Sequence, residues 1–321
     1  MTQNSLPTYL HQFQKLNRSS HPQLGKAPHK PILLMSILQL VRDGIITANR
    51  IFITPELVIA FKSNWELLVK TGHTATFALP FFHLRSEPFW RIVFTPGMGN
   101  GITSISSFST LKRLVAFAEI DKDLFDLMCD STTSTILENA LLSDYFPETK
   151  SRYFVGNNYS VAAEIEQEMV NEPAAVYQQR MIAIENSDTD LEEERFIRNS
   201  IFKKQIPKLY GYRCCISGMK LEAGINVQMV DACHIKPFSE SRDDTISNGI
   251  SLAPNLHRAF DRGLITITAN YRVRISREFK ENNTPFSLHQ FENRMLLLPE
   301  LPKDYPSIEN LIWHNKERFI L

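Results

Sequence analysis

The chain has 321 residues with 35 basic and 35 acidic side chains, so its formal net charge is zero. Hydrophobic residues make up 43% of it, which excludes wholesale disorder, and the length suits two domains of ordinary size. No apolar run approaches the ~20 residues of a membrane span, the first residues lack a signal-peptide pattern, and the four cysteines form no paired CxxC knuckles, so we expect a cytoplasmic protein with reduced thiols.

The first half of the chain predicts a mainly helical domain with a small sheet. Apolar residues at helical spacing predict helices over residues 5–20, 32–41, 111–118, 124–129 and 133–142, with a further helix starting at Pro55. Two aromatic runs, 78–85 and 88–94, are predicted as strands or as a strand and a loop. The Gly- and Ser-rich stretch 96–110 is predicted as a loop.

Three motifs of this half stand out. They are Gly-Lys-Ala-Pro-His-Lys-Pro at 25–31, Pro-Phe-Phe-His-Leu-Arg at 80–85 with Phe-Trp shortly after it, and Tyr-Phe-Pro at 145–147. They resemble the sulfur-binding domain of type IV restriction enzymes, which recognise phosphorothioated DNA, over residues 5–155. In that family a non-bridging sulfur lies in an apolar pocket while basic residues hold neighbouring phosphates. An apolar wall favours sulfur because a phosphate oxygen there would lose its hydration without gaining a partner.

The resemblance implies pocket and phosphate roles for nine residues. Phe146 and Pro147 are expected to line the sulfur pocket, with Phe82 and His83 opposite them. Phosphate or base contacts are expected from Arg85, Arg91, Lys26, His29 and Lys30. Simpler roles stay open, because buried aromatic side chains are usually core, a Phe-Pro pair can end a helix, and lysines are common on solvated loops.

Residues 156–190 are predicted to form a helical connector in two pieces, interrupted by Pro173, that serves as a spacer or as a dimer seam. A helix is predicted over 195–210, within a stretch that has seven basic residues and no acidic one: Arg195, Arg198, Lys203, Lys204, Lys208, Arg213 and Lys220. Zero net charge is not typical of a nucleic-acid binder, but this local run offers phosphate contacts. A solvated helix face would have the same pattern.

The second half holds an ordered set of polar residues. Asp-Ala-Cys-His-Ile-Lys-Pro at 231–237 is followed by an Asn-Gly pair and then by Asn-Leu-His-Arg-Ala-Phe-Asp-Arg-Gly at 255–263. The order of His234, Asn248 and His257 resembles the HNH nuclease motif, in which a hairpin and a helix hold one divalent metal. That resemblance implies a phosphodiesterase with double-stranded DNA as its partner.

Each of the three residues suits one step of hydrolysis. A neutral imidazole can take a proton from attacking water, which is the role we assign to His234. Such a ring must be held in one orientation, and Asn248 is expected either to grip it or to pin the loop around it. His257 is the expected metal ligand, on a short helix that starts near Pro254 and ends at Gly263.

The second metal ligand is less clear from the sequence. HNH nucleases commonly carry an acidic ligand directly before the base, and here Cys233 has that place. Asp231 lies three residues before the base, so on a regular strand the two side chains face opposite sides. Asp231 therefore reaches the metal if the strand bends, and otherwise orders the hairpin. One imidazole with oxygen ligands favours Mg²⁺ or Mn²⁺ and leaves softer metals open.

The predicted fold class is α+β, with a mainly helical DNA-reading domain followed by a ββα-metal nuclease domain. The predicted boundaries are 1–155 for a sulfur-binding-like recognition domain, 156–190 for the connector and 191–321 for the HNH endonuclease domain. Within the last, strands are predicted over 211–218 with a turn, 226–232, 264–268 and 271–275. His314 is expected to be structural.

The expected function is a modification-dependent DNA endonuclease of restriction or defence, which binds phosphorothioated DNA and cuts nearby. Cutting both strands with one site per chain needs two visits or two subunits, so a homodimer is a further expectation. Two alternatives stay open. The first half could recognise methylated cytosine, which would require a base-flipping pocket. The nuclease domain could also be inactive, because Cys233 takes the place of an acidic ligand.

Overall fold

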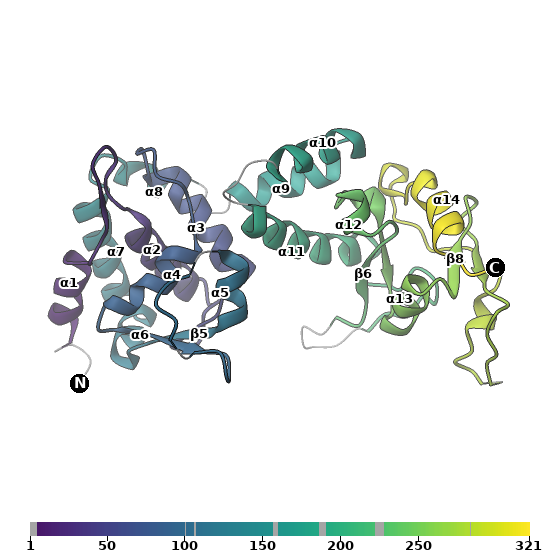
Figure 1. Ribbon diagram of the computed structural model, residues 1–321, viewed down its shortest axis with the longest axis horizontal. Coiled ribbons are helices and arrows are strands. Elements are labelled where there is room, and N and C mark those ends of the chain that lie inside the picture. Colours follow the sequence, from purple (N-terminus) through teal and green to yellow (C-terminus); the bar gives the residue numbers. More distant parts are fainter. Residues whose placement is uncertain are drawn as a thin grey trace. The chain divides into compact units, whose positions relative to one another are not determined.

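A computed structural model describes residues 5–99, 101–105, 107–156, 160–185, 191–221, 228–282 and 284–321. The chain divides into two compact units, one of Met1–Ala163 with Ser187–Ile197 and one of Glu164–Asn186 with Arg198–Leu321 (Figure 1). Both combine helices with small sheets, which confirms the predicted α+β class. None of the helices in the described ranges is both long and apolar enough to cross a membrane. The three-part division predicted from the sequence stays a prediction.

Helices make up most of the first unit. They are α1 Leu6–Gln14, α2 His29–Arg42, α3 Pro55–Leu68, α4 Ala78–His83, the 3₁₀ helix η2 Leu84–Ser86, α5 Phe108–Leu114, α6 Lys122–Cys129, α7 Ser131–Tyr145 and α8 Lys150–Val155. Helix α2 is central, since every side chain from Lys30 to Val41 is buried and the helix packs against α3, α4, α6 and α7. Its sequence, apolar almost all round, predicts this burial. Helix α3 starts at Pro55 as predicted, and Thr54 caps it by accepting from the Leu57 amide.

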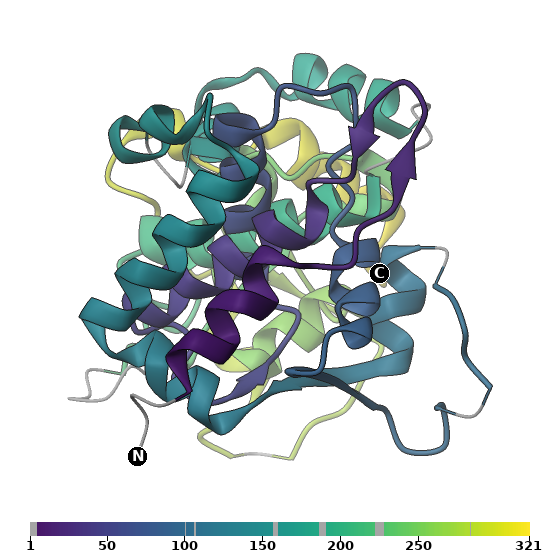
Figure 2. The same cartoon turned by 90° about the vertical axis from the view of Figure 1, so that its left-hand side faces the viewer.

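Two small sheets complete this unit. Strands β3 Arg50–Ile51, β5 Val115–Ile120 and β4 Trp90–Phe94 form an antiparallel sheet in that order. A hairpin of β1 Ser20–His21 and β2 Gly25–Lys26 precedes α2, and Figure 2 shows it as the purple arrows. The hairpin and the start of α2 place several polar side chains of residues 17–30 on one side of the unit.

The sequence predicts the two aromatic runs as strands or as a strand and a loop, and for the first run this prediction is wrong. Residues 78–85 form helix α4 and most of η2. Phe81 and Phe82 are both fully buried, which alternation along a strand would not allow on a one-sided sheet, and Pro80 lies in the first turn of the helix, where proline is tolerated. The second aromatic run does contain a strand, β4.

The helix predicted over 111–118 is also wrong in its second half. It ends at Leu114, and the chain continues as β5, the central strand of the sheet. Strand β5 pairs with a neighbour on each side, and Ala118 and Ile120 are buried there. Pairing on both sides and burial have outweighed the local helical pattern.

The second unit is built from short elements. Its helices are α9 Ser160–Asn171, α10 Ala174–Glu185, α11 Leu191–Leu209, α12 Phe238–Ser241, α13 Pro254–Asp261 and α14 Ile308–Glu317, with 3₁₀ helices η3 Ile246–Asn248, η4 Leu288–Phe291 and η5 Pro302–Asp304. Its strands are β6 Asp231–His234, β7 Gly249–Leu252, β8 Ile265–Ile267 and β9 Val273–Ile275. The first residues of α9 and α11 count with the first unit. The predicted break at Pro173 is confirmed, because α9 ends and α10 begins around it.

Strands β6 and β7 pair antiparallel, and helix α13 follows directly after them. Pro254 occupies the first turn of α13, and Gly263, with a φ of 68°, follows its end, so the predicted start and stop are confirmed. A side chain at Gly263 would collide with the carbonyl oxygen of Arg318. The amide of Ile320 donates to the Gly263 carbonyl at 3.0 Å, so the segment after α14 lies against the end of α13.

The remaining strand predictions hold in part. The strand predicted over 226–232 begins at Asp231, and positions 226 and 227 lie outside the described residues. The segment 211–218 forms turns rather than a strand, because its two glycines adopt left-handed φ values of 59° and 77°. The two strands predicted nearer the C-terminus are confirmed as β8 and β9.

Candidate functional site

His234 ends strand β6, and one nitrogen of its imidazole is held by a carboxylate. Nε2 lies 2.7 Å from Oδ1 of Asp244, whose side chain is almost fully buried. A carboxylate accepts hydrogen bonds, so a neutral imidazole satisfies this contact in the tautomer with its proton on Nε2, which leaves Nδ1 as the acceptor. Within the described ranges Nδ1 has no hydrogen-bond partner. This is the arrangement that a general base requires.

Asp244 was missed by the sequence reasoning, which considered Asn248 for holding the ring. The available signal was a pair of adjacent acidic residues, Asp243 and Asp244, in the loop between the predicted base and the predicted amide. The two carboxylates have different roles. Asp243 accepts from the amide and hydroxyl of Thr245 and shapes the turn, and burial raises the pKa of Asp243. Asp244, in contrast, points to the imidazole of His234.

Asn248 is fully buried and fixes the loop rather than the ring. Its Oδ1 accepts from the Lys236 amide at 2.9 Å, and its Nδ2 donates to the carbonyls of Lys236 and Asp243 at 2.8 and 2.9 Å. Asn310 of α14 also donates to Oδ1, at 3.1 Å. None of these described hydrogen bonds reaches the His234 ring. Of the two roles that the sequence leaves open for Asn248, the geometry therefore favours pinning the loop over gripping the ring.

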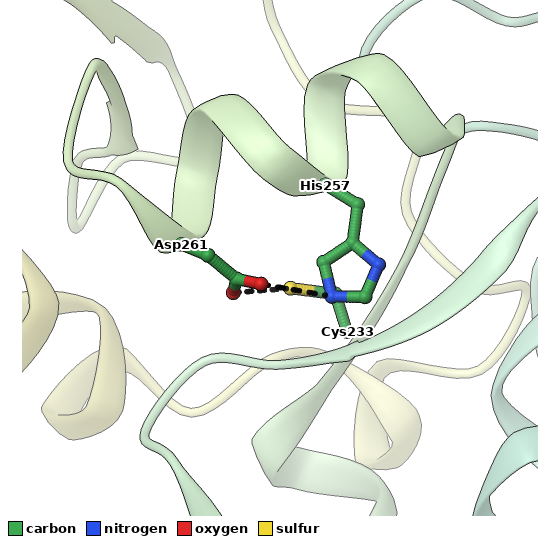
Figure 3. Close-up of side chains that lie close together, drawn as sticks. All are labelled: Cys233, His257 and Asp261. Carbon is green, nitrogen blue, oxygen red and sulfur yellow. Dashed lines mark hydrogen bonds and ion pairs between the residues drawn. The ribbon is translucent and has the colours of Figure 1, made fainter.

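His257 projects from α13 toward strand β6, with a carboxylate near each ring nitrogen. Nδ1 lies 3.3 Å from Oδ2 of Asp231, and Nε2 lies 3.4 Å from Oδ2 of Asp261, four residues further along the same helix. Figure 3 shows Asp261, His257 and the sulfur of Cys233 facing one another. One ligand atom from each of these three lies within 4.8 Å of the other two. Asp261 was not among the ligands predicted from the sequence, although its i+4 spacing from His257 could have indicated it.

These donors fit a divalent metal ion, and the ligand roles predicted for His257 and Asp231 stay predictions. The two imidazole nitrogens point in opposite directions, so an ion on Nε2 of His257 would meet Asp261 and not Asp231. Asp231 then orients the ring by accepting from Nδ1, as carboxylates commonly do behind metal-bound histidines. Cys233 is buried, and burial together with the nearby Asp261 carboxylate raises the pKa of its thiol. A neutral thiol is a weak ligand for Mg²⁺ or Mn²⁺.

The candidate base and one candidate metal ligand line the same cleft. A cleft of about 260 Å³ is lined by His234, Ile235, Pro237, Phe260, Asp261, His314 and Arg318. His234 reaches the cleft from the end of β6 and Asp261 from the end of α13, although successive residues of β6 point to opposite faces of the hairpin. A phosphodiester in this cleft could therefore meet both groups.

Comparison with known proteins agrees with this geometry. Residues 214–268 match the family model described as HNH endonuclease, and this span contains β6, β7 and α13. This segment is an HNH endonuclease domain. No curated protein matches the chain. A solved structure named "Modification dependent TagI restriction endonuclease" is similar at 21% identity over 38% of this chain and 38% of that chain, with a TM-score of 0.30.

His314 supports the HNH domain from outside the matched segment. It is buried, its ring stacks on Phe260 with centroids 3.7 Å apart, and its nitrogens contact the hydroxyl of Thr266 and the carbonyl of Phe260. Burial lowers the pKa of His314 to about 4, so the ring is neutral at pH 7. These contacts fit the structural role expected for it.

The first unit holds a larger pocket, of about 930 Å³. Its wall comes from the segment before α2, from α2, and from α4 with η2: Asn17, Arg18, Ser19, Ser20, His21, Leu24, Ala27, His29, Lys30, His73, Leu79, Pro80, His83, Arg85 and Ser86. Four of the predicted contact residues are therefore brought together, namely His29, Lys30, His83 and Arg85. Among the described residues, the lining contains several cations and imidazoles and no acidic side chain, which suits an anionic ligand.

The three cationic side chains of this wall differ in how many of their hydrogen-bond donors already have a partner within the protein. Lys30 is buried and forms a 2.5 Å ion pair with Glu87. Arg85 stacks over the ring of Phe82 and donates to two backbone carbonyls at 3.1 and 2.6 Å. Arg18 lies 4.4 Å from the ring centroid of Tyr145, and its described acceptor is one carbonyl at 3.5 Å. Arg18, which the sequence reasoning missed, has the most capacity left for a ligand.

The other five predicted contact residues do not line this pocket. Phe82 is fully buried beneath Arg85, and Phe146 is buried at the end of α7, next to exposed Pro147. Lys26 is exposed on β2, and Arg91 is exposed on β4, where it forms an ion pair with Glu119. Two of the imidazoles that line the pocket, His29 and His83, have pKa values lowered by burial.

Proposed function

We propose that this protein is a metal-dependent DNA endonuclease whose HNH domain hydrolyses phosphodiesters. The observation that carries the proposal is the contact between His234 and Asp244, made beside a cleft that His234 shares with Asp261. Asp261 in turn faces Nε2 of His257. Phosphodiester hydrolysis needs a general base and a metal ion at the same phosphate, and His234 and Asp261 both line this cleft.

Each residue has its own role in the proposed hydrolysis. Nδ1 of His234 takes the proton of the attacking water, and Asp244 stabilises the imidazolium that forms, because a carboxylate at 2.7 Å favours the charged ring. Asn248 keeps the loop between them in place. His257 and Asp261 would hold a divalent ion, Mg²⁺, Mn²⁺ or a softer metal, which when bound would stabilise negative charge on the phosphate.

We propose further that the first unit recognises modified double-stranded DNA, most simply a phosphorothioate. The support is the resemblance of its motifs to sulfur-binding domains together with the pocket in which His29, Lys30, His83 and Arg85 meet. Leu24, Leu79 and Pro80 provide apolar wall beside these cations. Such a mixture suits a soft sulfur atom next to charged phosphate oxygens.

The charges on α11 fit the same function. Lys203, Lys204 and Lys208 are exposed along the helix, within the second unit, and offer phosphate contacts. Arg198, from the same basic run, does not, because it is buried against Glu168 at 2.7 Å. A double-strand cut by one HNH site per chain requires two visits or a homodimer.

The decisive experiment compares one duplex with and without a single phosphorothioate. The full chain should bind and, with Mn²⁺, cleave the sulfur-bearing duplex preferentially. A third duplex carrying methylated cytosine tests the alternative modification. Equal affinity for the sulfur-bearing and plain duplexes would remove the phosphorothioate proposal. Binding without cleavage under several divalent metals would instead favour a DNA-binding protein with an inactive HNH domain, in which Cys233 has replaced the usual acid.

A further inference from the structure

The ring of Phe202 lies flat against the ring of His234. Their centroids are 3.9 Å apart and their planes differ by 3°, which makes this a parallel stack. Phe202 belongs to α11, within the second unit, and its side chain is 1% exposed. It therefore comes from outside residues 214–268, which match the HNH family.

The backbone of the hairpin makes room for this contact. Gly249 faces His234 across the β6–β7 pair, and its φ of −123° would suit any residue. A side chain there would nevertheless clash with α11, because an added Cβ would lie 2.6 Å from Cγ1 of Ile206 and 3.0 Å from Cε2 of Phe202. The glycine after Asn248 thus has a packing reason: it lets α11 approach the base.

Helix α11 is itself held firmly at this level. Arg198, one turn before Phe202, is 2% exposed and donates to the hydroxyl of Tyr177 on α10 and to the carboxylate of Glu168 on α9. All three residues belong to the second unit. The phenylalanine under the base is therefore fixed by a buried polar network and cannot swing away without breaking it.

We propose that Phe202 is a positioning residue for His234, which sets the plane of the imidazole while Asp244 sets its rotation within that plane. A single hydrogen bond at Nε2 leaves the ring free to tilt about that bond, and a flat ring at van der Waals distance removes the tilt. The imidazole, which lines the cleft, then keeps one orientation before DNA binds. The inference rests on the proposed hydrolytic role of His234 and adds a residue to it.

The first test replaces Phe202 by Leu in the full chain, which keeps apolar volume but removes the flat surface. We expect kcat for cleavage to fall roughly 10-fold or more, because misplacing a general base forfeits part of the 10²–10⁴-fold that it supplies. The KM for the duplex should stay near the wild-type value. Phe291→Leu, at another buried phenylalanine of the second unit, is the matched control and should change neither constant.

The second test reads the ring directly and does not depend on activity. With ¹³C-labelled histidine, the His234 resonances, identified by their loss in His234→Ala, should lose the ring-current shift of the stack in Phe202→Leu and should relax as a more mobile ring. The control variant should leave them in place. If the wild-type protein cleaves no DNA, the proposed function fails, but these resonances still decide whether Phe202 orients the imidazole.

A third variant guards against misfolding of Phe202→Leu. Gly249→Ala should push α11 away and lower kcat in the same sense, and adding Ile206→Ala should restore part of the loss by removing the closer clash. Unchanged His234 resonances in Phe202→Leu would overturn the proposal. So would an unchanged kcat in a variant whose resonances show a mobile ring.

Discussion

The two units treat their charged side chains differently. In the HNH domain each functional imidazole has carboxylate partners: Asp244 holds His234, and Asp231 and Asp261 flank His257. The pocket of the first unit has no acidic side chain in its wall, and Arg18 is held there by one long hydrogen bond and an aromatic face. A hydrolytic centre must be organised before substrate arrives, whereas an anion site keeps positive charge for its ligand.

The largest expected effect is that of His234→Ala, which removes the base and leaves the metal donors in place. Cleavage with Mn²⁺ should fall by about 10²–10⁴-fold, the usual worth of general-base catalysis. Gel-shift affinity for the same duplex should not change. His289→Ala, at an imidazole paired with Glu281, is the matched control. Wild-type cleavage by His234→Ala would remove the mechanism.

The next largest effect is expected at the two aspartates beside His257, whose variants should differ in their loss of Mn²⁺ affinity. Asp261→Asn removes a proposed metal ligand, whereas Asp231→Asn removes a partner that orients the ring, a change that typically costs about 10–100-fold in metal affinity or activity. We therefore expect the larger loss of Mn²⁺ affinity, measured by calorimetry or by the electron paramagnetic resonance of bound Mn²⁺, in Asp261→Asn. The reverse order would restore Asp231 as the ligand, as the sequence predicted.

His314 should make the stability of the second unit depend on pH. Its pKa is about 4 in the fold against about 6.5 when unfolded, so its contribution is present above pH 6.5 and is lost as the pH falls toward 4. The shift corresponds to about 2 kcal/mol lost at pH 5 relative to pH 7. Of the three tryptophans in the chain, Trp313 belongs to the second unit. Its ¹⁹F signal in protein labelled with fluorotryptophan can therefore follow urea unfolding of that unit.

The variant His314→Gln should flatten this pH dependence, since an amide does not titrate. Comparing its pH series with that of the wild type cancels the contribution of other groups, such as Asp243, whose raised pKa acts in the opposite sense. Parallel curves for the two proteins would show that His314 is not kept neutral by the fold.

The smallest expected effect is in the first unit. Arg18→Gln should weaken binding of the sulfur-bearing duplex by about 10-fold or more, the worth of one charged hydrogen bond, and should lower the salt slope by about 1. Lys122→Gln, at an exposed lysine already paired with Asp126, is the control. An equal loss on the plain duplex assigns Arg18 to a phosphate, and an unchanged salt slope would exclude it from the interface.

The two units also differ in how much of their sites the sequence could predict. The HNH motif is local, so the order of His234, Asn248 and His257 indicated the hairpin, the helix and the base. The partners that complete it were harder to find: Asp244 lies in a loop whose path no periodicity describes, and Phe202 comes from a helix 32 residues earlier in the chain than the base. In the first unit, pocket walls come from distant segments, and burial decides which aromatic side chains are core.

The closure of the last residues onto Gly263 has a practical consequence for handling the protein. Asp261 is two residues before that glycine, and the Ile320 amide bonds to its carbonyl. Trimming the chain behind α14, or attaching a bulky fusion partner there, would loosen the carboxylate without altering any ligand. With Asp261 as the proposed metal ligand, such a protein would require more metal for the same rate, and an affinity tag for purification is better placed at the opposite terminus.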